Sequence, residues 1–400
     1  MRAELPACVQ RLLTELTPAD GPQLVYDLAR LEQTMREVMA AARAAQVQVL
    51  FAVKSFPLRP VLELAARHTD GFDLASPGEL ASVADLVASR HLVSVADPTQ
   101  QTTPALAARW PHLTAADGRE ELGDADARAP ARCVISCEDP DALTLALQRC
   151  PRAQLALRLS ASLCGRSEAS GSVQSGQGHH RSRFGVDAAP DGGAHLRASL
   201  TALVAQARAH AVTPGLHLHA SDMTATSTAR WLADARAALA LAAEVGLDPS
   251  FLDLGGGWHG VPDVAATWAQ LRAELPAGLP IFVEPGRLLA REAGYAIGWV
   301  RAGRRLADRE LRVVDLSRVC HARWSQLELV AAAPRPGHGR KVLLAGPTCY
   351  EDDVLGEWQL DDALALPPGA PVVLRGVTGY AAAWNTGFGG LPAATVRFVR

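Results

Sequence analysis

From about residue 23 onward, short apolar runs alternate with longer amphipathic stretches. The apolar runs are rich in valine and leucine, which is typical of buried parallel strands. They are Val47–Val53, Cys133–Ile135, Leu155–Leu159, Leu216–Leu218, Phe251–Leu254 and Pro280–Val283. The stretches between them carry the three-and-four spacing of helices, and they include Pro60–Arg67, Asp139–Leu147, Leu196–His210 and Thr228–Val245.

This alternation over about 260 residues predicts a parallel sheet, and a closed (β/α)8 barrel suits that length. A doubly wound open sheet is the alternative, but no Gly-rich turn opens a first helix after a first strand. After Arg287 helices become scarce, and short strands follow at Ala296–Val300, Leu311–Val314, Leu327–Ala331, Val342–Leu344, Val372–Leu374 and Thr395–Val399. We therefore expect a TIM-like barrel at residues 23–290 and a mostly β domain formed by residues 1–22 and 291–400.

The composition, with 48% hydrophobic and 20% charged residues, is typical of a globular enzyme. A net charge of −3 and the lack of a basic run argue against a nucleic-acid partner. Seven irregularly spaced cysteines support neither a zinc site nor a disulfide framework. No apolar run resembles a signal peptide or is long enough to cross a bilayer, so we expect a cytoplasmic protein without membrane contact.

Two segments are predicted to be loops, Ala115–Ala131 and Ser160–Ser182. The second is rich in Gly and Ser, which favours a mobile segment. A long loop within a compact domain is more often an active-site cover or a disordered insert than filler.

Several apolar runs end in a reactive or Gly-rich element. These elements are Lys54, Asp73, Arg158, His219, Gly255–Gly257 and Glu284–Arg287. All strands of a parallel barrel point one way, so these residues are predicted to converge on the face where such folds keep their active sites. Taken singly, a strand-end lysine is often solvated, a histidine structural, a Gly triplet a tight turn, and Arg158 the partner of a barrel carboxylate. The repetition at six strand ends favours a site.

The chemistry of this set suits pyridoxal phosphate. A lysine at the mouth of an apolar strand can form a Schiff base. Consecutive glycines let backbone N–H groups approach phosphate oxygens, and Arg287 and the Ser221 hydroxyl are candidates for further phosphate contacts. A carboxylate facing the pyridine nitrogen keeps the ring a strong electron sink.

Motifs in a fixed order make the resemblance specific. They are AVKSF at 52–56, GFDLASPGEL at 71–80, SRFGVD at 182–187, LHLHAS at 216–221, LDLGGG at 252–257, EPGR at 284–287, GPTCYEDD at 346–353 and TGYAAAWN at 378–385. Together they resemble the fold-type III pyridoxal-phosphate decarboxylases, which include ornithine, arginine and diaminopimelate decarboxylases. The resemblance covers roughly residues 23 to 398 and implies an alanine-racemase-like barrel.

The resemblance also implies roles for single residues. Lys54 is the imine lysine, Glu284 bonds the pyridine nitrogen, and Cys349 returns a proton to Cα after CO₂ leaves. The ring is surrounded by Asp73, Arg158 and His219, with His219 stacked on it. The remaining cofactor contacts are Ser221, Gly255, Gly256, Gly257, Gly286, Arg287 and Tyr380. In this family Cys349 and its neighbours complete the site of the other subunit, so a homodimer with shared active sites is implied.

Glu284 separates two chemistries. Alanine racemases share the barrel but present an arginine to the pyridine nitrogen, whereas a glutamate favours a stabilised quinonoid carbanion and hence loss of CO₂. Three alternatives stay open: a racemase or epimerase, a non-catalytic cofactor-binding protein, and a scaffold without cofactor. Glu284 and Cys349 speak against the first, and the long β domain speaks against the second. The third leaves Lys54, the Gly triplet and Glu284 without a shared purpose.

Departures from the family concern the substrate. Tyr350 follows the catalytic cysteine where ornithine-type enzymes carry Asp and diaminopimelate-type enzymes carry Glu, and it is uncharged at neutral pH. Asp353 matches the second acid of that segment. In the segment Val314–Trp324, Arg323 falls where diaminopimelate enzymes place an arginine for a distal carboxylate, with Arg318 and His321 as nearby candidates. Trp258 and His259 are candidates for the pocket lining. We expect a small-molecule, amino-acid-like substrate other than plain ornithine, such as a carboxylate-bearing or carrier-linked precursor of a siderophore or antibiotic.

Overall fold

The computed structural model describes residues 5–114, 130, 132–160, 184–186, 194–219, 228–290, 292–330, 339–361 and 366–400. It divides into two compact units. We call Met35–Gly286 the barrel unit, and Met1–Thr34 with Arg287–Arg400 the sheet unit. Ser221, the loop that follows Ser160, and all of the SRFGVD motif except residues 184–186 lie outside the described residues.

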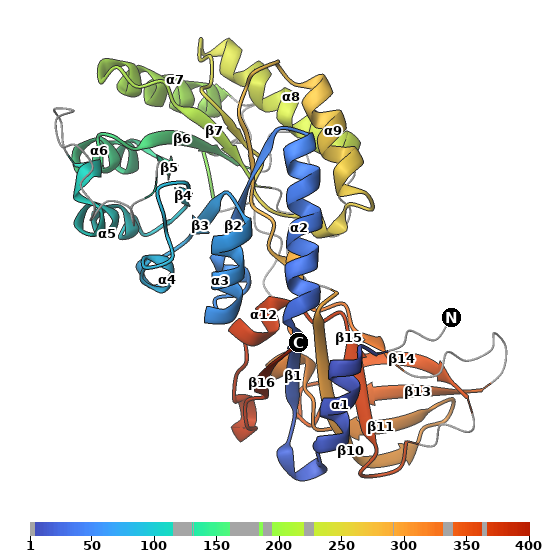
Figure 1. Cartoon of the computed structure of the whole chain (residues 1–400). Helices are drawn as coiled ribbons and strands as arrows, with labels where there is room; N and C mark the ends of the chain where they lie inside the picture. The colour runs from blue at the N-terminus through green and yellow to red at the C-terminus, as the bar shows by residue number, and fades with distance from the viewer. Residues whose placement is uncertain are drawn as a thin grey trace. The chain divides into compact units, whose positions relative to one another are not determined.

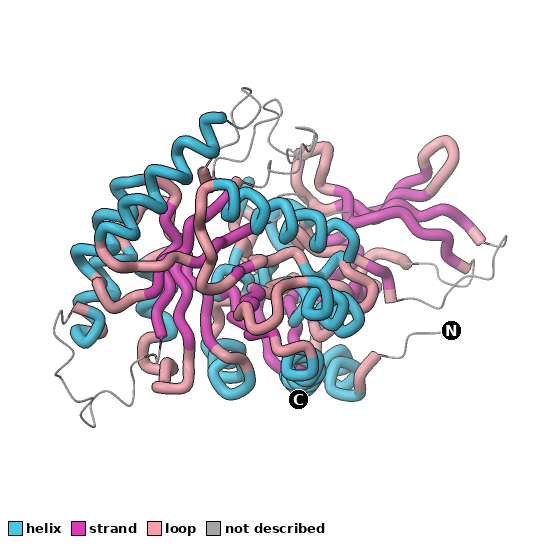
Figure 2. Tube along the Cα trace, turned by 90° about the horizontal axis from the view of Figure 1, so that it is seen from above, coloured by secondary structure: helices cyan, strands magenta, loops and turns pink. Residues whose placement is uncertain are grey.

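Eight parallel strands close the barrel unit, which confirms the predicted fold class (Figures 1 and 2). They are β2 (Val47–Ala52), β3 (Gly71–Leu74), β4 (Leu92–Val95), β5 (Arg132–Cys137), β6 (Gln154–Leu159), β7 (Gly215–Leu218), β8 (Leu252–Asp253) and β9 (Ile281–Val283). Strand β9 pairs with β2, so no edge remains open. The carboxyl ends of all eight strands therefore meet at one face.

Apolar side chains from several strands hold this barrel together. Leu50, Leu92, Val134, Phe251 and Phe282 belong to one buried cluster, in which the two phenylalanine rings stack 4.9 Å apart. Full burial of each such side chain contributes about 1.5–3 kcal/mol. This packing fixes the register of the strands and thereby the positions of the residues at their ends.

Helices surround the strands in Figure 2, and their polar caps explain where several of them begin. They are α2 (Leu28–Ala44), α3 (Arg59–His68), α4 (Pro77–Val83), α5 (Thr102–Arg109), α6 (Pro140–Arg149), α7 (Ala194–Ala209), α8 (Thr228–Glu244) and α9 (Val264–Glu274). Side chains of Ser76, Asp139 and Asp263 accept hydrogen bonds from the first turns of α4, α6 and α9. No helix in the described ranges combines the length and apolar character that a bilayer span requires.

The sheet unit is built on an eight-stranded sheet whose main path runs β12-β15-β10-β11-β13-β14, with β1 joining β10 to β16. Its strands are β1 (Gln23–Asp27), β10 (Gly294–Arg305), β11 (Glu310–Val314), β12 (Glu328–Leu329), β13 (Arg340–Ala345), β14 (Val354–Leu360), β15 (Pro371–Arg375) and β16 (Thr395–Val399). Its helices are α1 (Ala7–Glu15), α10 (Arg287–Ala290), α11 (Arg318–His321) and α12 (Gly379–Ala383).

Strand β1 differs from the sequence-based expectation that the barrel begins at residue 23. It pairs antiparallel with β10 and parallel with β16, so it belongs to the sheet of the sheet unit. All five of its residues are buried, as in a barrel strand. A continuous apolar run shows that a strand is buried, but it does not show which sheet the strand joins.

Candidate active site

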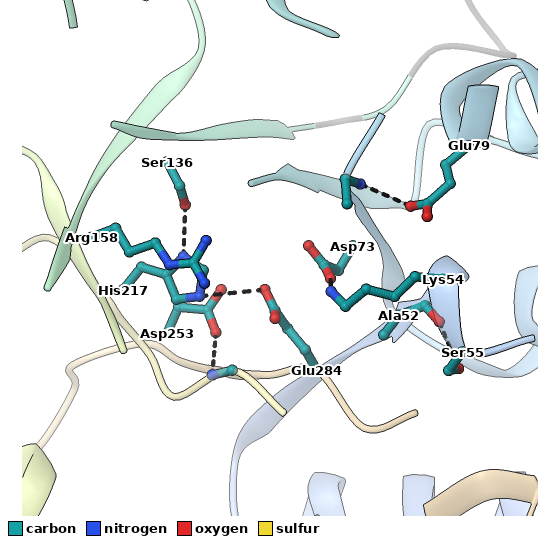
Figure 3. A network of polar contacts seen from close by, with 12 residues as sticks. Ala52, Lys54, Ser55, Asp73, Glu79, Ser136, Arg158, His217, Asp253 and Glu284 are labelled. Carbon is teal, nitrogen blue, oxygen red and sulfur yellow. Dashed lines mark hydrogen bonds and ion pairs between the residues drawn. The ribbon is translucent and has the colours of Figure 1, made fainter. Parts of the chain in front are cut away.

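Lys54 and Asp73 form an ion pair at the ends of neighbouring strands. Lys54 lies in the 3₁₀ turn Val53–Ser55 directly after β2, and Asp73 lies in β3. The lysine Nζ donates to the Asp73 Oδ2 at 2.5 Å, as Figure 3 shows. The Asp73 side chain is fully buried, whereas that of Lys54 is 35% exposed. The amine is therefore held in place by a buried carboxylate while part of the side chain stays accessible.

A second buried group consists of His217 in β7, Asp253 in β8 and Glu284 after β9. Each is at most 2% exposed. The His217 Nε2 lies 3.9 Å from the Glu284 Oε1, which is too long for a hydrogen bond. Neither of these atoms, nor the Asp253 Oδ2, has a partner in an N–H or hydroxyl group, but the Asp253 and Glu284 carboxyls share a side-chain hydrogen bond with each other. Buried polar atoms without partners are uncommon, and here they gather at one place.

Burial and mutual repulsion shift the titration of these groups. Burial raises the pKa of Asp253 to about 7. It raises the pKa of Glu284 well above its usual range, and the charges of Asp253 and Asp73 add to this effect. Burial also lowers the pKa of His217 well below its usual range, so its ring is neutral at physiological pH. Without a cationic partner, Glu284 therefore keeps its proton to a higher pH than an ordinary glutamate does.

The Gly triplet forms a turn next to this group. Gly255 has φ of +63°, and a Cβ at that position would lie 2.5 Å from the Leu218 carbonyl oxygen, so only glycine fits. Gly257 has φ of +105°. The Gly255 carbonyl accepts hydrogen bonds from the Glu284 N–H and the Trp258 indole N–H, both at 2.8 Å. The turn and Glu284 are thereby fixed to each other.

His219 and Arg158 complete the barrel set. His219 is half-buried, and its ring lies close against the turn, since a Cβ at Gly256 would lie only 3.3 Å from its Nε2. Arg158 pairs with Glu138 at 3.2 Å and lies over the Phe184 ring at 4.7 Å. Arg158 thus has the barrel carboxylate partner that the sequence offered as its alternative role.

A family model described as pyridoxal-dependent decarboxylase, pyridoxal binding domain, matches residues 28–291. The chain belongs to this family. The match confirms the predicted family, the pyridoxal phosphate cofactor and the reaction class, which is that of a pyridoxal-phosphate-dependent carboxy-lyase acting on amino acids.

Solved structures of decarboxylases share the fold over nearly the whole chain. The arginine decarboxylase of Paramecium bursaria Chlorella virus, bound to agmatine, has a TM-score of 0.72 and 17% identity, covering 98% of this chain and 99% of that one. The lysine/ornithine decarboxylase of Vibrio vulnificus, complexed with putrescine, has a TM-score of 0.70 and 19% identity, covering 99% of both chains. The lysine decarboxylase of Selenomonas ruminantium has a TM-score of 0.65 and 19% identity, covering 99% and 96%. A search among curated proteins gave no match.

The residues of the barrel unit fit the cofactor of this decarboxylase family. The unpartnered Glu284 Oε1 suits the protonated pyridine nitrogen, and the Gly255–Gly257 turn suits a phosphate. Lys54 supplies the only lysine amine of the unit, because the chain contains one other lysine, Lys341, on β13 of the sheet unit. Pyridoxal phosphate, when bound, supplies the electron sink that stabilises negative charge at Cα.

The other predicted cofactor contacts lie in different places. Gly286 packs against Ser55 in the barrel unit. Arg287 begins α10 and Tyr380 lies in α12, both in the sheet unit, and burial lowers the pKa of Arg287 while Tyr380 opposes that effect. Cys349 is an exposed free thiol of the sheet unit.

Arg323 of the sheet unit lies against aromatic rings. Its guanidinium stands 4.5 Å from the centre of the Trp384 ring and 5.8 Å from that of Trp324. Trp324 in turn meets Tyr380 edge to face at 4.9 Å. The Arg323 Nε is buried without a hydrogen-bond partner, and no carboxylate of the described residues forms an ion pair with it. The charge is therefore positioned by stacking rather than by a protein anion.

The sequence predicts Asp353 as a substrate contact, and the structure corrects this. Asp353 is 2% exposed, and its two oxygens accept hydrogen bonds from Ser317, from the Arg318 N–H and from Thr348. Its carboxylate thus joins the start of α11 to the loop before β14. His321 is likewise occupied, since its Nδ1 accepts from the Ser317 N–H and its Nε2 meets the Pro392 carbonyl.

The candidate pocket residue Trp258 also has a structural role. Its ring is fully buried, stacked 4.3 Å from Trp231 and edge to face with Trp268. Three buried residues of the site were not predicted from the sequence: His217, Asp253 and Ser136. The Ser136 hydroxyl lies 2.8 Å from the His217 Nδ1, at hydrogen-bond distance. A sequence feature that could have identified them is a polar residue inside an otherwise apolar run. Burying such a side chain costs free energy unless it has a hydrogen-bond partner or serves a function.

The raised pKa values predict how the stability of the cofactor-free enzyme depends on pH. Asp253 and Glu284 keep their protons in the folded state at a pH where the unfolded chain has lost them, so stability falls as pH rises. The lowered pKa of His217 works in the opposite direction, but only below its unfolded value of 6.5. Above pH 6.5, and up to the folded-state pKa values of these two carboxyls, we expect the melting temperature to fall as pH rises. The double variant Asp253→Asn/Glu284→Gln should be nearly flat over this interval, and an equally steep fall in that variant would contradict the assignment.

Proposed function

We propose that this enzyme removes the α-carboxylate of an amino acid that carries a second carboxylate, with Lys54 as the lysine that holds the cofactor. The observation that carries the proposal is Glu284, a buried carboxyl with an unpartnered oxygen beside the Lys54–Asp73 pair. A carboxylate at that position favours the pyridinium form of the cofactor and hence the loss of CO₂ over racemisation. The family supplies the reaction class, and Glu284 supplies the reason for it.

The candidate site residues each have a part in this proposal. Asp73 orients the Lys54 amine, and Glu284 holds the proton of the pyridine nitrogen. His219 covers one face of the ring, where its position against the Gly turn suits stacking. Within the barrel unit, the phosphate is assigned to Gly255–Gly257 with Gly286. The family motifs name Ser221, Arg287 and Tyr380 as further phosphate contacts. Arg158 shapes the electrostatic field of the pocket through its pair with Glu138.

Arg323 is the residue that favours a substrate with a second carboxylate. A planar guanidinium donates two parallel hydrogen bonds to a carboxylate, and stacking on Trp384 reduces the freedom it would lose on binding. Tyr350, which is 50% exposed, replaces the acid that would attract a distal ammonium group. The solved relatives bound agmatine, putrescine and cadaverine, which are cationic amines. We therefore propose that this chain differs from them in the charge of the distal group.

A homodimer is part of the same proposal. Cys349 would deliver a proton to Cα in the active site of a second copy, as the family resemblance implies. The thiol of Cys349 is exposed, as this role requires. Among the described residues, the exposed large apolar side chains all belong to the sheet unit, and a second copy would cover them: Trp324, Tyr350, Trp384 and Phe388.

A panel of amino acids, assayed for CO₂ release, tests the substrate proposal. We expect turnover of amino acids with a distal carboxylate, and little turnover of ornithine, lysine or arginine. Arg323→Ala should raise KM for the preferred substrate by about 10- to 100-fold, the cost of one charge-assisted contact, with a smaller change in kcat. Arg375→Ala, which removes an exposed arginine of the sheet unit paired with Glu328, is the matched control. Preference for a diamine precursor, or release of inverted amino acid without CO₂, would overturn the proposal.

A further inference from the structure

Three side chains form a line across the interior of the barrel. Ser136 on β5 meets the His217 Nδ1 at 2.8 Å, and the His217 Nε2 faces the Glu284 Oε1 at 3.9 Å (Figure 3). The alignment of strands β5 to β9 brings these side chains together, although 148 positions separate the serine from the glutamate. Neither Ser136 nor His217 has a role in the proposed reaction.

We propose that Ser136 and His217 form a reversible hydrogen-bond pair that accommodates both charge states of Glu284, with His217 as the positioning residue. This inference rests on the proposed role of Glu284 at the cofactor nitrogen. A buried carboxyl that must change its charge needs a neighbour that can act as donor or acceptor. An imidazole backed by a hydroxyl meets that need, because both groups can do either.

The two arrangements differ in the position of one imidazole proton. When Glu284 is ionised, the Nε2–H of His217 donates to the carboxylate, and the Ser136 hydroxyl donates to Nδ1. When Glu284 is protonated, Nε2 accepts the carboxyl proton, and the Nδ1–H donates to the Ser136 oxygen. Ionisation of Glu284 thus releases one proton, while the ring stays neutral and its remaining proton changes from Nδ1 to Nε2.

The surroundings explain why the ring stays neutral in both arrangements. Burial and the positive charges of Arg158 and Lys54 oppose a second proton on His217, and His219 adds to them. The carboxyls of Asp253 and Asp73 oppose ionisation of Glu284. A donor at Nε2 would offset part of that repulsion, because a hydrogen bond to a charged group is stronger than one between neutral groups.

The unpartnered atoms make this line the natural place for such a contact. The His217 Nε2 is buried without a hydrogen bond and faces the Glu284 Oε1 across a gap of 3.9 Å, while a side-chain hydrogen bond joins the Glu284 carboxyl to Asp253. A small approach of the two side chains, or one bridging water, would satisfy both. His91 offers a contrast: it is equally buried, but its Nδ1 accepts from the Ala88 N–H and its Nε2 meets the Ala66 carbonyl.

Nitrogen-15 spectra of histidine-labelled full-length enzyme, with and without pyridoxal phosphate, report the tautomer directly. We expect the His217 signal, identified by its loss in His217→Gln, to change from the Nδ1–H to the Nε2–H form as Glu284 ionises with rising pH. The signal should stay constant in Glu284→Gln. A single tautomer of His217 at every pH, or a doubly protonated ring, would overturn the inference while leaving the proposed decarboxylation intact.

Variants supply an independent readout. His217→Leu should lower kcat about 10- to 100-fold, the loss expected for one hydrogen bond to a charged group, with KM within about twofold. His217→Gln retains a donor for Glu284 and should recover part of that loss at high pH, where the carboxylate form dominates. His91→Gln is the matched control and should lower stability without changing the pH profile of kcat. Equal losses in the Leu and Gln variants across the pH range would contradict the inference.

Discussion

Lys54→Ala is expected to lower kcat by about three orders of magnitude or more. The variant lacks the amine that binds the cofactor covalently and is then replaced by the amine of the substrate. No other lysine can replace it within the barrel unit, since the chain's second lysine, Lys341, lies exposed on β13 of the sheet unit. The assay is CO₂ release at saturating substrate and cofactor.

Lys54→Arg is the matched control for the ion pair. It keeps a positive charge for Asp73, whose carboxylate is fully buried, but provides no nucleophilic amine at neutral pH. We expect Lys54→Arg to be as inactive as Lys54→Ala but more stable, because removal of one partner leaves a buried charge uncompensated. Activity within tenfold of wild type in either variant would contradict the role of Lys54.

Glu284→Gln is expected to have the second-largest effect, a loss of about 100-fold or more in kcat, with pyridoxal phosphate still bound. Glutamine fills the same volume but cannot carry the negative charge that keeps the pyridine nitrogen protonated. The change should appear in kcat rather than in KM, since the charge is needed most when negative charge develops at Cα. Single-turnover CO₂ release measures the loss in the chemical step, and the amount of bound pyridoxal phosphate shows whether the cofactor is retained.

Asp253→Asn provides the comparison for Glu284→Gln. Asp253 is as buried as Glu284 and accepts a hydrogen bond from the Gly255 N–H at 2.8 Å, which asparagine can also accept. We expect a loss of less than about tenfold, because the turn is preserved and Glu284 retains its charge. Near-normal turnover in Glu284→Gln, or an equal loss in both variants, would place the decisive carboxyl elsewhere.

Much of the candidate site could be predicted because the carboxyl ends of all strands in a parallel barrel lie at the same face. Side chains that follow the strands converge, so Lys54, Asp73 and Glu284 could be grouped from the sequence alone. The Gly triplet likewise signals a turn, and the structure shows positive φ at Gly255 and Gly257. These inferences depend on chain direction alone, which the alternation of strands and helices already indicates.

The remaining features depend on contacts that no local pattern encodes. Asp353 lies in a family-like motif, but its hydrogen bonds come from Ser317, which follows β11, and from Thr348, which follows the neighbouring strand β13. The apolar pattern likewise does not predict β14 (Val354–Leu360), because its run contains a glycine and a glutamate. His217 lies inside a strand, where sequence suggests a structural residue, and its relation to Ser136 follows only from the closed barrel. Long-range pairing decided each of these cases.

Borohydride reduction of the enzyme with its cofactor, followed by peptide mass spectrometry, tests the central claim most directly. Reduction converts a lysine-linked cofactor into a stable secondary amine, and the two lysines of the chain lie in different peptides. We predict a pyridoxyl adduct on the peptide that contains Lys54 and none on the peptide that contains Lys341. An adduct on Lys341 alone, or a fully reduced enzyme without any adduct at Lys54, would contradict the account.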